Sequence, residues 1–513
     1  MSSHRFDADF GTIADLIREN ALEAPDHAAL IDRDRELSYE ELDRMMDRIA
    51  AALLVRGIGP RDTIAICAAT SIEYVAVFLG ALRIGVAVAP LAPSATAESL
   101  AAMAADSGAK VLFLDATTNG NFMTVDLPHV AIDDLPGGEA LSMWLAPIDA
   151  KPSAVTIDPD WIFNVIYSSG TTGTPKGIEQ SHMMRWQQLK RLGPDAYGPA
   201  SRSMISTPLY SNTTLVCLFP TLASGGAAIL MHRFDARQFL GLAEKHRATH
   251  AMLVPVQYSR IMAVPDFDTF DLSSFKLKLS TSAPFSAALK RDILQRWPGG
   301  LVEYYGMTEG GGVTVLHAHQ FPDKLHTVGQ PSEGNDIRLI DEDGREIVTP
   351  GEAGEVVGRS SAMMNGYHNQ PGKTREAEWF DAEGRRYIRT GDIGRFDADG
   401  FLTLLDRRKD MIISGGFNIY PSDLETVLVQ HDAVAEASVV GVPSEAWGET
   451  PIAFVVAKPA AAIDAEGLRE WANARVGKMQ RLGALRLVKS LPRSAIGKVL
   501  KRELRDAFDG KLA

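Results

Sequence analysis

The chain has 513 residues, of which 45% are hydrophobic and 23% charged, and its formal net charge is −13. This length exceeds one ordinary hydrophobic core, so two or more globular domains are expected. The negative charge excludes the basic stripe of a nucleic-acid-binding protein, and it excludes docking on an anionic membrane through charge.

Two cysteines, Cys67 and Cys217, lie far apart in apolar segments. They are predicted to be reduced core residues, since neither a disulfide framework nor a zinc-binding spacing is present. The N-terminal residues lack the apolar segment of a signal peptide, and no apolar run reaches the length of a membrane span. A cytoplasmic location is therefore expected.

From about residue 10 to residue 405, helical stretches alternate with short apolar runs rich in β-branched residues. The segments 64–67 and 111–114 are predicted strands, and 72–82 and 236–245 are predicted helices. Such alternation is typical of α/β proteins in which helices cover mostly parallel sheets.

A stretch rich in glycine and hydroxyl residues runs from Ser168 to Gly177, in the order Ser-Ser-Gly-Thr-Thr-Gly-Thr-Pro-Lys-Gly. The segment 161–167 before it is predicted to be a buried strand, and Ser181 after it to cap a helix. Glycines admit an anion to backbone N–H groups, hydroxyls donate, and lysine adds charge, so the stretch is predicted to hold phosphates. It differs from the Walker A pattern, and an ordinary surface loop has the same composition.

The character of the sequence changes after residue 335. Turn-bounded strands at 337–340, 395–396 and 401–404 predict hairpins in a more antiparallel sheet. From residue 406 a unit of about 100 residues begins, a usual size for a domain. It contains a predicted helix at 422–431 and predicted strands at 437–440 and 452–456.

Four further segments follow the glycine-rich stretch: Tyr304–Glu309, Arg389–Asp392, Asp406–Glu425 and Pro492–Lys498. Together the five segments resemble, in order and over most of the chain, the signatures of the superfamily of AMP-forming acyl-CoA synthetases, peptide-synthetase adenylation domains and luciferases. The resemblance implies an α/β fold with a large N-terminal domain, 1–405, of layered α/β subdomains and an antiparallel-rich third sheet. It also implies a small, mobile α+β C-terminal domain, 411–513, that rotates about a hinge at 406–410, by motif position at Lys409.

The same resemblance implies an ATP site that uses Mg²⁺. Thr308 would touch the α-phosphate and Glu309 would bind Mg²⁺, which takes one or two carboxylates. Tyr305 would lie against adenine, although alone it would more readily be a core tyrosine. Asp392, otherwise a turn aspartate, would accept from the ribose hydroxyls with Arg407 beside it. The β- and γ-phosphates would be held by Ser168, Ser169, Gly170, Thr171, Thr172, Gly173 and Lys176.

Lys498 would carry the adenylation step according to the resemblance. By position near the C-terminus it would be a solvated lysine, but the family's lysine in this segment bridges the substrate carboxylate and the α-phosphate. Rotation of the C-terminal domain would then bring Gly415 and Gly416 beside the pantetheine thiol of CoA. Trp447 would stack on the CoA nucleotide and Arg481 would meet a CoA phosphate, although 479–482 departs from the family pattern by lacking a proline.

The acyl pocket is the least defined part of the site. Ser211 stands where many relatives have a histidine. No Asp or Glu occurs between Ser201 and Arg233, and a buried ammonium without an anion would be costly, so an amino-acid substrate is disfavoured. An aromatic or arylalkanoic acid, or a medium-chain fatty acid, is expected. The pocket positions implied by the family are Tyr210, Ser211, Asn212, Gln257, Ser282 and Gly310.

The expected activity is that of an AMP-forming carboxylic acid–CoA ligase, with a small-molecule carboxylic acid, ATP and CoA as its partners. A homodimer is left open. Three alternatives remain at this point: a ligase that loads a carrier-protein phosphopantetheine, a non-catalytic nucleotide-binding protein on the same fold, and an oxygenase of the luciferase kind.

Overall fold

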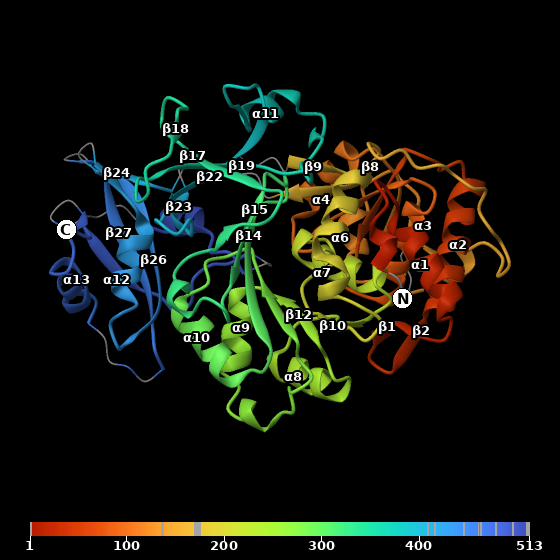
Figure 1. Ribbon diagram of the computed structural model, residues 1–513, viewed down its shortest axis with the longest axis horizontal. Helices are drawn as coiled ribbons and strands as arrows, with labels where there is room; N and C mark the ends of the chain where they lie inside the picture. The colour runs from red at the N-terminus through yellow and green to blue at the C-terminus, as the bar shows by residue number, and fades with distance from the viewer. Residues whose placement is uncertain are drawn as a thin grey trace. The chain divides into compact units, whose positions relative to one another are not determined.

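The computed structural model describes residues 3–134, 138–168, 176–407, 410–414, 417–444, 447–459, 461, 464–477, 480–494 and 497–508 (Figure 1). The chain divides into two compact units. The first comprises residues 1–325, 331–336 and 358–388, and the second comprises residues 326–330, 337–357 and 389–513.

The larger sheet has nine strands, and those from β15 to β2 lie wholly in the first unit. The neighbouring strands β1, β11, β10, β12, β13 and β14 of this sheet pair in parallel, as the alternating sequence pattern predicts. Strands β1 and β2 form an antiparallel hairpin. In sheet order the strands from β15 to β2 are β15 (Val313–His317), β14 (Gly300–Gly306), β13 (Leu277–Ser280), β12 (His250–Leu253), β10 (Arg202–Ile205), β11 (Ala227–Leu230), β1 (Ala28–Asp32) and β2 (Arg35–Ser38).

An eight-stranded sheet completes the first unit. It places β9 and β8 side by side as the second and third strands from one edge. The two residues that flank positions 169–175, Ser168 and Lys176, therefore lie on neighbouring strands. In sheet order the strands are β20 (Gly366–Tyr367), β9 (Lys176–Ser181), β8 (Ile162–Ser168), β4 (Ala87–Pro90), β3 (Thr63–Cys67), β5 (Ala109–Leu114), β6 (His129–Ala131) and β7 (Glu139–Ala140).

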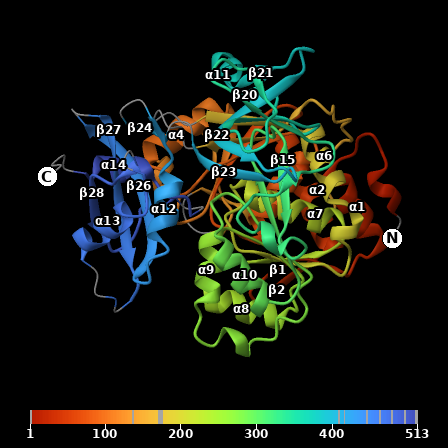
Figure 2. The same ribbon diagram turned by 60° about the vertical axis from the view of Figure 1, so that its left-hand side comes forward.

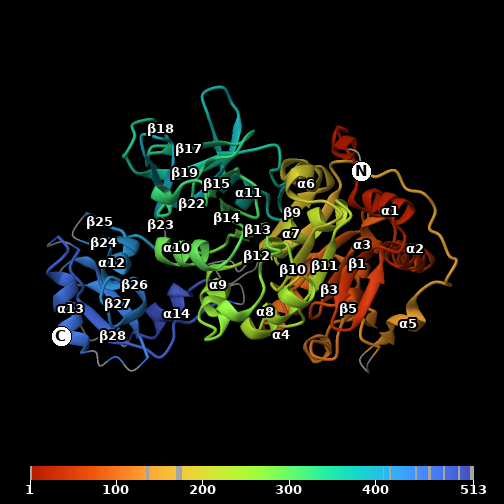
Figure 3. The same cartoon turned by 60° about the horizontal axis from the view of Figure 1, so that its bottom comes forward.

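Helices between the two sheets form one continuous hydrophobic core with residues of both. The helices are α1 (Ile13–Glu23), α2 (Tyr39–Val55), α3 (Ile72–Leu82), α6 (His182–Ala196) and α7 (Asn212–Ala223). Figure 1 shows α1, α2 and α3 side by side, and every residue of α3 except Glu73 is buried, which explains its mostly apolar sequence. Helices α8 (Ala236–Lys245), α9 (Pro255–Met262) and α10 (Ala287–Arg296) form a further group (Figure 3), and α4 (Ala97–Asp106) packs on β5.

A third sheet is antiparallel wherever its strand pairing is defined, which confirms the predicted hairpins. Strands β19 and β22 begin in one unit and end in the other. The strands are β17 (Asp336–Ile340), β18 (Glu346–Ile347), β19 (Gly354–Arg359), β21 (Glu378–Phe380), β22 (Arg386–Phe396) and β23 (Leu402–Arg407), with α11 (Pro371–Glu376) in the connection from β20 to β21.

The C-terminal part of the second unit is α+β, with helices packed on a five-stranded sheet (Figure 2). The strands are β25 (Phe417–Ile419), β24 (Ile412–Ser414), β27 (Gly448–Ala457), β26 (Val434–Ser444) and β28 (Ala484–Leu487). The helices are α12 (Pro421–Leu428), α13 (Ala465–Asn473) and α14 (Lys501–Asp506). The predicted helix at 422–431 is therefore shorter at its C-terminal end, and both predicted strands are longer.

Cys67 and Cys217 are free and buried, as predicted. None of the helices among the described residues has both the length and the apolar character needed to cross a membrane.

Candidate functional site

The predicted phosphate loop joins two antiparallel strands. Residues 169–175, and with them Ser169, Gly170, Thr171, Thr172 and Gly173, lie outside the described residues. The strands on either side are paired in register, with Ser168 of β8 opposite Lys176 of β9. The predicted strand before the loop is β8, and Ser181 caps α6 by accepting from the Met184 N–H, as the sequence predicted.

Lys176, Tyr367 and Glu309 come together from three separate segments of the first unit. The Tyr367 hydroxyl donates to Oε1 of Glu309 at 2.8 Å. Nζ of Lys176 lies 5.1 Å from the centroid of the Tyr367 ring, within cation–π range. Burial and the nearby Glu309 carboxylate raise the pKa of Tyr367, so its hydroxyl stays a donor at neutral pH. One tyrosine therefore holds both the lysine at the loop's end and the predicted magnesium ligand.

The backbone of the Thr308–Gly310 turn is held at each of its three carbonyl oxygens. Nε2 of Gln180 donates to the Thr308 carbonyl at 2.7 Å, and the Met364 N–H donates to the Glu309 carbonyl at 2.9 Å. Oγ of Ser360 donates to the Gly310 carbonyl at 2.9 Å. Gly310 has φ +73°, and a Cβ there would lie 1.9 Å from the Ala362 carbonyl oxygen, so only glycine fits this turn. This position is thus set by backbone geometry.

The chemistry of this turn fits Mg²⁺. Among the described residues, no group of three or more His, Cys, Asp or Glu side chains is arranged so that it could hold a metal ion. Mg²⁺ needs none, because it keeps several waters and binds through one or two carboxylates together with substrate phosphates. Glu309 is partly exposed. Among the described contacts, the hydrogen bond from Tyr367 occupies Oε1, one of the two carboxylate oxygens. A single oriented carboxylate of this kind is the donor that a phosphate-bound Mg²⁺ requires.

Apart from Gly310, the predicted acyl-pocket residues lie at the start of α7, on α9 and in the loop after β13, all in the first unit. Tyr210, Ser211 and Asn212 lie at and just before the start of α7, where Ser211 is buried. The next residue, Thr213, is hydrogen-bonded to Ser282 at 2.6 Å between hydroxyl oxygens. This contact joins α7 to the loop after β13.

Gln257, on α9, has a side chain turned toward the protein backbone. Its Nε2 donates to the Ser206 carbonyl at 3.2 Å, and its Oε1 accepts from the Val254 N–H at 3.2 Å. The residue is buried. Within the described contacts, Nε2 therefore joins α9 to the residue that follows β10, and Oε1 caps the start of α9 itself.

In the second unit, Asp392 and Arg407 form an ion pair. They face each other across β22 and β23, and Nε of Arg407 lies 3.0 Å from Oδ1 of Asp392. The sequence predicted that Arg407 stands beside Asp392. Asp392 is largely buried, and Arg407 orients its carboxylate. Because Arg407 is 40% exposed, solvent screens the contribution of this ion pair to stability.

Lys498, also in the second unit, lies in a tight turn. Its N–H donates to Oγ of Ser494 at 3.2 Å and its carbonyl accepts from the Ser494 N–H at 2.8 Å. Gly497 before it has φ +79°, a conformation that favours glycine. Glycine at position 497 therefore suits the turn that presents the Lys498 backbone.

Of the residues predicted to meet CoA, two are described. Gly415 and Gly416 lie outside the described residues, as does the predicted hinge residue Lys409. Trp447 has 50% of its surface exposed, and Arg481 is exposed. An indole left half in water is suited to stacking on a planar ring.

Three residues of this region were missed by the sequence analysis: Tyr367, Gln180 and Arg185. Tyr367 lies in the two-residue strand β20, and Gln180 is a fully buried residue of β9. Only the Gly-Tyr pair at 366–367 offered a signal, and a lone tyrosine is usually a core residue.

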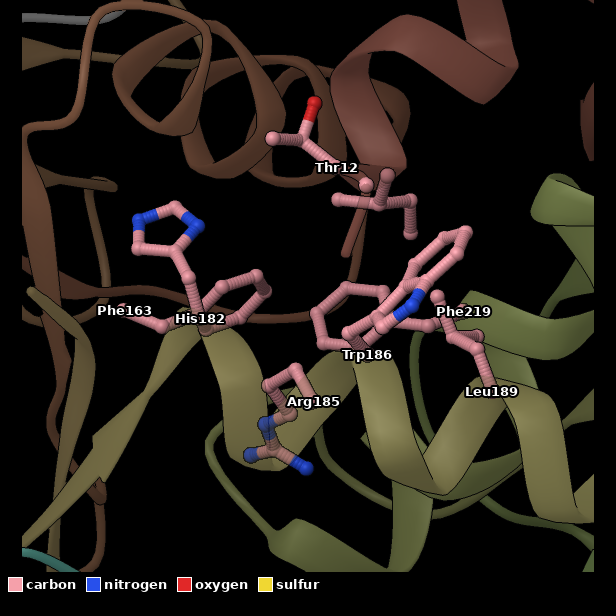
Figure 4. A pocket seen from close by; sticks show the side chains of 9 residues that line it. Thr12, Phe163, His182, Arg185, Trp186, Leu189 and Phe219 are labelled. Carbon is pink, nitrogen blue, oxygen red and sulfur yellow. The ribbon is translucent and has the colours of Figure 1, made fainter. Parts of the chain in front are cut away.

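A small cavity lies beside α6 (Figure 4). Its volume is about 10 Å³, the space of about one water molecule, so it is too small to receive an acyl group. His182 points into it with Nε2 unpartnered among the described contacts, and burial lowers the pKa of this histidine to about 4. The lining residues are Gly11, Thr12, Ile13, Phe163, His182, Arg185, Trp186, Leu189 and Phe219.

Comparison with known families gives two matches. The family model described as AMP-binding enzyme matches residues 17–368, and the model described as AMP-binding enzyme C-terminal domain matches residues 423–498. These ranges contain the Lys176–Tyr367–Glu309 cluster and Lys498, respectively.

Individual relatives align over almost the whole chain. A feruloyl-CoA synthase of an Amycolatopsis species is 34% identical over 92% of this chain and 94% of its own length. A fatty acid–acyl-carrier-protein ligase of Streptomyces coeruleorubidus is 30% identical over 98% of this chain and 97% of its own length. The solved O-succinylbenzoate coenzyme A synthetase of Bacillus subtilis, in complex with ATP and magnesium ion, has a TM-score of 0.82 at 26% identity, covering 96% of this chain and 99% of that one.

Proposed function

Because this chain belongs to the AMP-binding enzyme family and is an AMP-forming acid–thiol ligase, we propose that it converts an aromatic or arylalkanoic acid to its CoA thioester. The observation that carries the proposal is the joining of Lys176, Tyr367 and Glu309 at the end of the predicted phosphate loop. The similarity to a feruloyl-CoA synthase, whose named product is an aryl-substituted thioester, supports the substrate class.

In the first step, an oxygen of the substrate carboxylate attacks the α-phosphorus of ATP. The bond between the α-phosphorus and the bridging oxygen breaks, and pyrophosphate leaves. Such a reaction depends mainly on positioning and on stabilisation of charge. Lys176 supplies a positive charge to the phosphates, Thr308 a hydroxyl to the α-phosphate, and Lys498 a cation between the carboxylate and the α-phosphate.

Glu309 would hold Mg²⁺, which when bound neutralises charge on the phosphates. Asp392, oriented by Arg407, would accept hydrogen bonds from the ribose hydroxyls, and Tyr305 would lie against adenine. The loop residues Ser168 to Gly173 would bind the β- and γ-phosphates.

In the second step, the thiol sulfur of CoA attacks the carbonyl carbon of the acyl adenylate. The acyl–oxygen bond breaks, AMP leaves, and the thiol proton is lost to solvent. Rotation of residues 411–513 about Lys409 would replace Lys498 by the 414–418 face. The exposed indole of Trp447 supports free CoA as the acceptor, since it can stack on the nucleotide.

A second candidate acceptor is a carrier-protein phosphopantetheine. The similarity to a fatty acid–acyl-carrier-protein ligase over 98% of the chain favours it, together with a fatty acid as the acid. The adenylation residues would be the same in both cases.

The test is AMP release from ATP and Mg²⁺ with benzoates, arylacetates, cinnamates and short to long fatty acids, each with and without CoA. CoA-dependent turnover with an aryl acid is the expected result. CoA-dependent turnover with fatty acids but with no aryl acid would overturn the proposed substrate class. Single-turnover release that CoA does not increase would favour the carrier protein.

A further inference from the structure

Arg185, on α6, is a buried cation with an unusual set of partners. Its side chain points into the protein interior, and the residue is 3% exposed. Nε and both Nη atoms donate hydrogen bonds, and every acceptor is a neutral amide oxygen. The acceptors are Oδ1 of Asn164 at 3.1 and 2.9 Å, Oε1 of Gln188 at 2.9 Å, Oδ1 of Asn212 at 2.8 Å, and Oε1 of Gln180.

This arrangement is costly for the folded state. Burial lowers the pKa of Arg185 to about 9, and no ion pair to this guanidinium is found within the described part of the chain. The rings of Phe163 and Phe219 flank it, with centroids 5.6 and 5.7 Å from Cζ. A buried charge without an anionic partner is costly, so the surrounding amide oxygens must replace the water that Arg185 has lost.

The guanidinium does determine the orientation of the amides around it. Arginine is only a donor, so each amide must turn its oxygen toward Arg185 and its NH₂ group away. For Gln180, this orientation directs Nε2 to the carbonyl oxygen of Thr308, at 2.7 Å. Nδ2 of Asn164 donates to the same Gln180 oxygen at 3.0 Å and reinforces the orientation. An amide turned the other way would place its oxygen against the Thr308 carbonyl.

A second branch leads from Arg185 to the start of α7. Asn212 is the first residue of that helix, and Thr213 after it bonds to Ser282. Arg185 is therefore connected to the turn that bears Thr308 and Glu309 and to the predicted acyl-pocket wall.

We infer that Arg185 is a positioning residue for adenylate formation, which acts through Gln180 on the backbone of Thr308. The inference rests on the proposed function, because it assigns Thr308 to the α-phosphate. Arg185 does not itself touch a substrate in this assignment. Its effect should appear in the first half-reaction and be absent from the second.

The test compares two variants at partners of Arg185, of which only one also loses the hydrogen bond to the Thr308 carbonyl. Gln180→Glu and Gln188→Glu each place a carboxylate beside Arg185, and both keep an oxygen to accept from the guanidinium. Only Gln180→Glu removes the donor to the Thr308 carbonyl and sets a second oxygen against it. Assays at pH 8 keep either carboxylate ionised beside the guanidinium.

Adenylate formation is measured as pyrophosphate release with a saturating acid, and the second step as thioester formation from supplied acyl adenylate. We expect Gln180→Glu to lower adenylate formation about tenfold or more, with the second step and the thermal unfolding midpoint close to those of the wild type. Gln188→Glu should retain adenylate formation within about twofold. Protection against thermal unfolding by ATP and Mg²⁺ gives a further readout that needs no acid, and Gln180→Glu should reduce it.

Equal rates in the two variants would overturn the inference, whether both are active or both impaired. A loss in Gln180→Glu that affects the two half-reactions equally, or that parallels a lowered unfolding midpoint, would overturn it too, because it would indicate a structural role alone. Failure of the proposed function is a separate result, in which the wild type itself forms no acyl adenylate with any acid and gains no protection from ATP and Mg²⁺.

Discussion

The hydroxyl of Tyr367 donates a 2.8 Å hydrogen bond to Oε1 of Glu309, across 58 residues of sequence. The same ring lies beside Nζ of Lys176. The phenol therefore orients the carboxylate while its ring contacts the cation.

Replacing Tyr367 by Phe should weaken the use of Mg²⁺ and ATP. The ring beside Lys176 remains, but Glu309 loses a hydrogen bond of a kind that contributes about 1.5–3 kcal/mol when one partner is charged. We expect the apparent affinity for Mg²⁺–ATP to fall roughly tenfold, measured from pyrophosphate release against Mg²⁺ concentration. Tyr387→Phe is the matched control, because it removes a tyrosine–carboxylate bond to Asp336 elsewhere in the same unit. Equal effects in both variants would contradict the role of Tyr367.

Replacing Lys498 by Ala should abolish most adenylate formation. A cation about 4 Å from a forming negative charge contributes roughly 4 kcal/mol at an effective dielectric near 20, which is nearly three decades in rate. Thioester formation from supplied adenylate should be spared, because Lys498 leaves the site in the second step. The two half-reactions should be measured separately, and an equal loss in both would refute the rotation.

Replacing Lys409 by Pro should impair the second step more than the first. Proline restricts φ to about −65° and would hinder the backbone change at a hinge. The comparison is the ratio of thioester formation to adenylate formation in single-turnover experiments. An unchanged ratio would exclude Lys409 as the hinge.

The contact between His368 and Glu179 should make stability depend on pH. Nδ1 of His368 lies 2.6 Å from Oε1 of Glu179, and this hydrogen bond, aided by the charges of Glu179 and Asp106, raises the pKa of His368 above its usual 6.5. The folded state then binds the proton more tightly than the unfolded state. The stabilisation is fully present below pH 6.5 and is lost as the pH rises through the raised pKa.

His368→Asn removes this titration. The thermal midpoint of the wild type should exceed that of the variant most at pH 5.5, and the difference should shrink by pH 9. The comparison between two chains cancels His182 and His250, whose pKa values burial lowers to about 4 in each case. A difference that is constant, or that grows with pH, would contradict the expectation.

The sequence by itself determined the local elements and the identity of the chemical groups. Strand β8, helix α3 and the Ser181 cap follow from patterns within about ten residues, where periodicity and capping act directly. The five ordered segments likewise identified the family, because each is contiguous. The hairpins after residue 335 were predictable for the same reason.

Only the tertiary structure decided which groups meet. Tyr367 reaches Glu309, and Gln180 reaches Thr308, through hydrogen bonds between segments that no local pattern connects. A tyrosine in a two-residue strand and a glutamine buried within β9 carry no signal of their partners. The buried charge of Arg185 was equally hidden, because arginines on helices are usually solvated and only the packing of α6 against β8, β9 and α7 removes it from water.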